Sequence, residues 1–109
     1  MSKNVIHQLV HTLSYGDAIS GEVLAMQRAL QQAGCDSIIY AINEHPKLKG
    51  LTVPYTQLDS NFTGQIILHY SLGSPLNNLY RSLSHAKRVL IYHNLTPAKY
   101  FADINPRVA

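Results

Sequence analysis

The sequence predicts an α/β protein with a parallel sheet flanked by helices. Apolar runs rich in β-branched residues alternate along the chain with segments whose apolar residues recur at helical spacing. Strands that alternate with helices pair in parallel, because each helix returns the chain to the edge of the sheet from which the strand began. At 109 residues the chain is long enough for one domain with its own core.

Five segments are predicted to be strands. In chain order they are residues 5–10, 37–41, 51–55, 65–70 and 88–93. The third is short, and Pro54 keeps it at an edge of the sheet because proline has no N–H to donate to a central ladder. His7 lies inside the first strand, where we expect a core histidine bonded to a backbone or side-chain partner.

The first predicted helix follows a turn at Gly16. Its apolar positions Ile19, Val23, Met26 and Leu30 recur at helical spacing, and either Asp17 or Ser20 can serve as N-cap. Gly34 marks its end.

Two further helices are expected after the fourth and fifth strands. Ser74–Pro75 and Thr96–Pro97 each place a capping residue before a proline, which suits the first position of a helix. In a parallel sheet all three helix starts lie along the carboxyl edge of the strands. If the sheet is doubly wound, the first and fourth strands are neighbours at the point where the winding reverses, and ligands bind in the crevice there.

Composition and charge narrow the function. Nine basic and six acidic residues give a net charge of +3. The longest basic run is Lys87–Arg88, so nucleic-acid binding, which needs a concentrated basic patch, is not expected. Cys35 has no partner for an internal disulfide, no stretch approaches the roughly 20 apolar residues of a membrane span, and residues 1–14 lack the features of a signal peptide. We therefore expect a cytoplasmic protein.

Candidate functional residues gather at the predicted carboxyl edge. His11, His69 and His93 each stand at or just past a strand end. His93 is the candidate for chemistry, because the helix start beside it disfavours the imidazolium and leaves a neutral ring that can accept a proton from a hydroxyl. None of the histidine pairs has the spacing of a zinc motif, so we expect no metal site.

Other groups at this edge can bind rather than react. Tyr15, Tyr70 and Tyr92 can stack on a sugar or base, or simply pack. The N–H groups that open the first helix favour an anion, a phosphate above all, although an ordinary capped loop would have the same sequence. Apart from Asp17 and Glu22 the acids fall outside this edge, which disfavours a two-carboxylate hydrolase.

Three motifs are spread over nearly the whole chain, in the order I-H-Q-L-V-H-T-L-S-Y-G-D-A-I-S-G-E, I-I-L-H-Y-S-L-G-S-P-L-N and L-I-Y-H-N-L-T-P-A-K-Y-F. In sequence and in order they resemble the N-terminal half of bacterial family 4 glycosyltransferases. The resemblance implies the GT-B architecture of two facing Rossmann-like domains. Residues 1–109 would then be a truncated Rossmann-like N-terminal domain on the acceptor side, without the C-terminal donor-binding domain.

The resemblance also implies roles for individual residues. His93 matches the histidine commonly placed at the reacting hydroxyl, and the donor phosphates would approach Gly16, Asp17 and Ser20, although the family's second glycine in this turn is missing. The acceptor would lie against the remaining residues of the same edge, which are His11, Tyr15, His69, Tyr70, Ser71, Asn94 and Thr96.

The hypothesis from sequence is the acceptor-side domain of a retaining glycosyltransferase that uses a nucleotide sugar as co-substrate and no cofactor. Its acceptor would be a polysaccharide or a lipid-linked glycan, which would bring the complete enzyme to the inner face of the membrane as a peripheral protein. The domain alone would be inactive, and its incomplete sheet would favour self-association. The alternatives are a stand-alone nucleotide- or phosphate-binding module without catalysis and a homo-oligomeric interaction protein.

Overall fold

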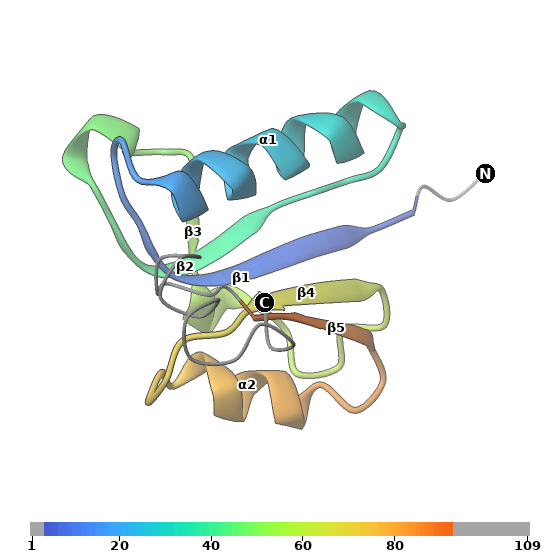
Figure 1. Ribbon diagram of the computed structural model, residues 1–109. Helices are drawn as coiled ribbons and strands as arrows, with labels where there is room; N and C mark the ends of the chain where they lie inside the picture. The colour runs from blue at the N-terminus through green and yellow to red at the C-terminus, as the bar shows by residue number, and fades with distance from the viewer. Residues whose placement is uncertain (1–3, 93–109) are drawn as a thin grey trace, which may run out of the picture.

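The computed structural model describes residues 4–92, which form an all-parallel β-sheet with helices on both faces (Figure 1). The strand order in this part of the chain is β3-β2-β1-β4-β5. The strands are β1 (Ile6–Leu13), β2 (Ile39–Glu44), β3 (Val53–Pro54), β4 (Gln65–His69) and β5 (Lys87–Ile91). The predicted fold class, a Rossmann-like α/β sheet, is confirmed.

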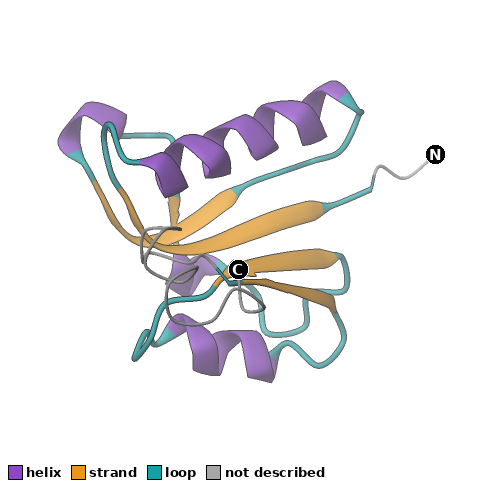
Figure 2. Ribbon diagram, viewed as in Figure 1, coloured by secondary structure: helices purple, strands orange, loops and turns teal. Residues whose placement is uncertain are grey.

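The two α-helices cover opposite faces of the sheet (Figure 2). Helix α1 (Ala18–Gln32) connects β1 to β2, and helix α2 (Leu76–Ser82) connects β4 to β5. These two connections leave the centre of the sheet in opposite directions, and right-handed crossovers therefore place their helices on opposite faces. β1 and β4 are neighbours, so the predicted switch point lies between them.

Helix α1 ends in a Schellman motif at the predicted glycine. Gly34 has a φ of +90°, a conformation that costs glycine little because it has no Cβ. The Gly34 N–H donates to the Gln31 carbonyl at 3.0 Å, and the Cys35 N–H donates to the Leu30 carbonyl at 2.9 Å. The last carbonyls of the helix are thus satisfied before the chain turns toward β2.

Two apolar clusters hold the layers together, one on each face. Successive residues of a strand point to opposite faces, and a sheet covered on both sides therefore needs continuous apolar strands. The cluster beneath α2 contains Leu9, Tyr40, Leu58, Ile66, Leu68, Leu76 and Leu83. The cluster beneath α1 contains Val10, Leu13, Val23, Ile39 and Ala41.

Two strands are longer than their apolar runs predict. Thr12 and Leu13 of β1 pair with Asn43 and Glu44 of β2, beyond the predicted ends of both strands. The apolar pattern did not predict this extension, because three of these four residues are polar. Backbone pairing between the two strands continues there without an apolar run. The region that was hardest to predict, residues 42–62, forms the 3₁₀ helices η1 (Pro46–Leu48) and η2 (Tyr55–Gln57) around the two-residue edge strand β3. The helix expected after Thr96–Pro97 lies outside the described residues.

A buried amide links the two halves of the sheet to helix α1. The Gln8 side chain is 0% exposed, and its Nε2 donates to the Val23 carbonyl at 3.0 Å. Its Oε1 lies 2.6 Å from Nε2 of His69, which is 3% exposed. Because the amide nitrogen of Gln8 is turned toward a carbonyl, the amide oxygen accepts, and Nε2 of His69 carries the proton.

His7 is the core histidine that its position in the strand predicts. It is 7% exposed, and its Nδ1 accepts a hydrogen bond from the Ile38 N–H at 2.9 Å. The ring stacks on Phe62 with centroids 5.1 Å apart and meets Tyr40 edge-on. Burial lowers the pKa of His7, and the negative charge of Asp36 opposes this in part. The ring is therefore neutral in the folded protein.

We predict that Gln8→Leu destabilises the fold more than its change in polarity suggests. The substitution leaves the Nε2–H of His69 buried without an acceptor, which costs about 1–3 kcal/mol of unfolding free energy. Urea unfolding measures the loss. Gln32→Leu, at an exposed position of α1, is the control and should change stability by less than about 0.5 kcal/mol. Equal urea midpoints for Gln8→Leu and the wild type would contradict the role given to Gln8.

We also predict that His7→Asn makes stability less sensitive to acid. The lowered pKa of His7 means that, below its ordinary value of 6.5, the unfolded chain binds more protons than the folded one. The contribution of His7 is complete above pH 6.5 and is lost as the pH falls through its folded pKa. Asparagine keeps an acceptor for the Ile38 N–H and does not titrate. Between pH 7 and pH 5 the wild type should lose more unfolding free energy than the variant, and parallel losses would count against this account.

Candidate functional site

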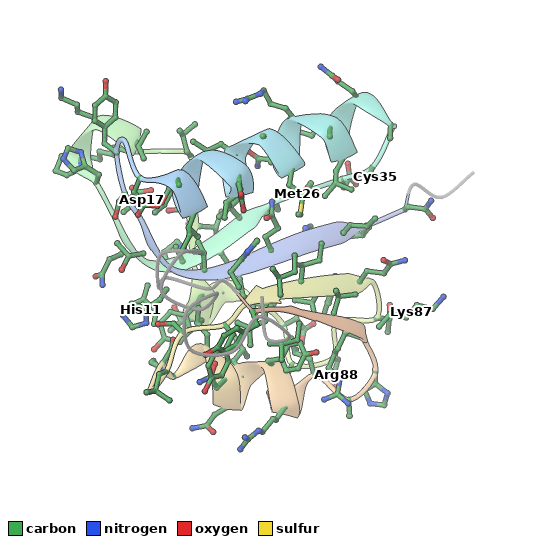
Figure 3. All side chains as sticks on the ribbon, viewed as in Figure 1. His11, Asp17, Met26, Cys35, Lys87 and Arg88 are labelled. Carbon is green, nitrogen blue, oxygen red and sulfur yellow. The ribbon has the colours of Figure 1, made fainter. Side chains whose placement is uncertain are left out.

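A serine and a histidine meet across the switch point at the carboxyl edge. Ser74 Oγ lies 2.8 Å from Nδ1 of His11, which joins the loop after β4 to the end of β1. The same Oγ accepts the Leu76 N–H at 3.2 Å, so the hydroxyl connects His11 to the start of helix α2. Ser74 is 5% exposed, and its contact with His11 is partly buried. Figure 3 shows His11 and Asp17 at this edge, at the opposite end of the sheet from Cys35 and Lys87.

The start of helix α1 is capped by a carboxylate. Asp17 is the N-cap, and its Oδ1 accepts the Ser20 N–H at 3.0 Å. Ser20 is 1% exposed, and its Oγ accepts the Ser14 N–H at 2.8 Å. Of the three residues expected at the donor phosphates, Gly16 and Asp17 are exposed and Ser20 is enclosed in the loop. A phosphate arriving at this helix start would meet the negative charge of Asp17.

Aromatic rings stand on both sides of the switch point. Tyr70 and Tyr92, at the ends of β4 and β5, stack with centroids 5.5 Å apart, and Tyr92 is 73% exposed. On the β2 side Tyr15 is 62% exposed and lies 5.9 Å from the ring of His45. Lys47 Nζ sits 4.7 Å above the Tyr15 ring. The edge therefore offers exposed ring surfaces to a ligand.

The structure brings together four of the residues expected to contact the acceptor and separates one. His11, Tyr15, Tyr70 and Ser71 all lie at the carboxyl edge, with the Ser71 carbonyl accepting from the Asn77 side chain at 3.0 Å. His69 lies beneath this surface and bonds to Gln8. Three expected residues, His93, Asn94 and Thr96, lie outside the described part of the chain, and the role of His93 stays a prediction.

Sequence reasoning missed three members of this edge. Ser74 was expected only as a helix cap, and its bond to His11 depends on two residues that are far apart in sequence. His45 and Lys47 belong to 3₁₀ helix η1 and its cap, whose single turn has no helical periodicity to detect. The neighbouring positions of the first and fourth strands were the signal that could have linked Ser74 to His11.

Among residues 4–92, no three His, Cys, Asp or Glu side chains stand close enough to hold a metal ion. None of the helices in the same range has the length and apolar character needed to cross a membrane.

Comparisons with protein-family models, with curated proteins and with solved structures found no match.

We predict that Asp17 stabilises the fold through its capping hydrogen bond. Asp17→Ala removes the acceptor for the Ser20 N–H and should lower the unfolding free energy by about 1 kcal/mol. Asp17→Ser keeps a capping oxygen and should lower the unfolding free energy by only a few tenths of a kcal/mol. Urea unfolding of the three proteins side by side makes the comparison, and equal stability of the alanine and serine variants would show that the cap contributes little.

Proposed function

We propose that the chain is the acceptor-side domain of a retaining glycosyltransferase that takes a nucleotide sugar as donor. The observation that supports this most is the make-up of the carboxyl edge. The His11–Ser74 pair lies at the switch point, with Tyr15 on one side and the stacked Tyr70 and Tyr92 on the other. Hydrogen-bonding side chains between aromatic rings suit a sugar, whose hydroxyls bond to polar groups and whose C–H faces pack on aromatic rings.

The cap of helix α1 favours a neutral ligand over a phosphate. Asp17 already places a carboxylate at the helix start, where an anion would otherwise gain from the helix dipole. In the proposed enzyme the donor phosphates would be bound mainly by a second domain, as in the family that the motifs resemble. His93 would orient or deprotonate the acceptor hydroxyl, and the acceptor would be a polysaccharide or lipid-linked glycan. The 109-residue chain alone would not transfer sugar.

A nucleotide-binding module without catalysis is the second candidate. Lys47 Nζ lies over the Tyr15 ring at the same edge, and an exposed ring beside a cation can receive a base and its phosphate. A nucleotide bound in this way would lie on the β2 side of the switch point alone, whereas the proposed acceptor would contact both sides.

Titration of the 109-residue chain, followed by amide NMR shifts, separates these functions. We expect neutral oligosaccharides to shift the amides of residues 11–15 and 70–75, and uridine diphosphate to leave them in place. Tyr92→Ala should weaken oligosaccharide binding roughly fivefold, which corresponds to about 1 kcal/mol of lost ring contact. Ile38→Ala, an exposed apolar residue at the amino end of β2, is the control and should bind as the wild type does.

Each contrary result favours a named alternative. Uridine diphosphate binding that Lys47→Ala weakens, without oligosaccharide binding, would support the nucleotide-binding module. Absence of shifts with every ligand would count against both ligand-binding functions and favour an interaction protein.

A further inference from the structure

Strand β5 ends in three apolar residues, Val89, Leu90 and Ile91, and stands at an edge of the described sheet. It pairs with β4 over five residues, and no described strand lies on its other side (Figure 1). Val89 is 45% exposed and Leu90 is 52% exposed, on opposite faces of the strand. In parallel sheets such continuous apolar runs belong to covered, central strands. Edge strands are usually protected by proline, bulges or charged side chains. The five-residue register of β5 contains no proline or bulge, and its two charged residues, Lys87 and Arg88, stand at one end, so that Val89, Leu90 and Ile91 carry no charge.

Alternate residues of β5 direct their backbone N–H and C=O groups toward β4 and away from it. The Lys87 N–H donates to the Gly64 carbonyl, and the Ile91 carbonyl accepts from the Tyr70 N–H. Residues 87 and 91 therefore direct their backbone groups toward β4. Because this direction alternates along a strand, Arg88 and Leu90 direct their N–H and C=O groups away from the sheet.

We propose that a second copy of the chain pairs with this edge, β5 against β5, antiparallel, with Leu90 on the twofold axis. The charges of β5 support this arrangement. Lys87 and Arg88 occupy one end of the strand, so parallel pairing would set like charges side by side, and antiparallel pairing moves them to opposite ends. The Arg88 guanidinium is already bonded to the Tyr80 and Arg81 carbonyls.

The phase of the backbone groups selects the register. With Leu90 opposite Leu90, the two residues exchange both of their backbone hydrogen bonds, and Arg88 pairs with Tyr92 of the second copy in the same way. Val89 then stands opposite Ile91 of the second copy, on one face of a continuous sheet. A register centred on Arg88 would place guanidinium against guanidinium, and one centred on Val89 would pair Lys87 with Ile91.

The proposal concerns the 109-residue chain and goes beyond the proposed function, because the interface uses the side edge of the sheet and not its carboxyl edge. Loss of ligand binding would leave the dimer intact, and a monomeric chain would leave the ligand experiments unaffected.

Cysteine cross-linking of the 109-residue chain tests the register. In a Cys35→Ser background, Leu90→Cys should form a disulfide-linked dimer on mild oxidation, because Cα atoms of a hydrogen-bonded antiparallel pair lie about 5.5 Å apart, within reach of a disulfide. Arg88→Cys should not cross-link, since its two copies would be four residues, or about 14 Å, apart along the strands. Leu51→Cys is the matched control at a similarly exposed leucine, 45% accessible, and should stay monomeric.

Sedimentation and hydrogen exchange test the edge without a cross-link. The wild type and the Leu51→Lys variant should sediment as dimers. The Leu90→Lys variant should sediment as a monomer, and circular dichroism should show that it is folded. The backbone N–H of residue 90 should exchange with solvent at least tenfold more slowly in the wild-type dimer than in the Leu90→Lys monomer. In both proteins this N–H is directed away from β4. A wild-type monomer whose Leu90 amide is protected would show that another part of the same chain covers the edge, and would overturn the proposal. A dimer that survives Leu90→Lys would overturn it as well.

Discussion

The fold depends on one buried amide at the centre of the sheet. Gln8 bonds to the Val23 carbonyl of α1 and to His69 of β4, so a single residue of β1 couples a helix and the neighbouring strand across the switch point. A fully buried polar group is stabilising only when every partner is present. This requirement fixes the position of α1 over the sheet, and with it the loop that carries Tyr15 and Asp17 to the carboxyl edge.

Much of the fold follows from sequence, because apolar runs and helix stop signals are local features. The parallel class, the edge position of the strand with Pro54, the adjacency of β1 and β4 and the end of α1 at Gly34 were all predictable. The polar ends of β1 and β2 were not predictable. Thr12 and Asn43 pair with each other in the sheet, and neither belongs to an apolar run that would indicate a strand.

The candidate site was less predictable, since its geometry joins distant residues. Strand ends predicted that His11, Tyr15, Tyr70 and Ser71 lie at the carboxyl edge, where the structure places them. They did not show that His69 lies below the surface, because the face on which a strand residue lies says nothing of how deeply it is covered. The contact between His11 and Ser74, 63 positions apart, requires the sheet order before it can be anticipated.

The two sides of the sheet end very differently, and this limits how the molecule can assemble. On one side β3 is two residues long and contains Pro54, so it offers little template for another strand. On the other side β5 has a regular five-residue register that ends in three apolar residues. The proposed self-complementary contact at β5 occupies this edge of the described sheet in both copies at once. Growth by strand addition then stops at a closed pair, and the asymmetry of the sheet protects the protein against fibrous polymers.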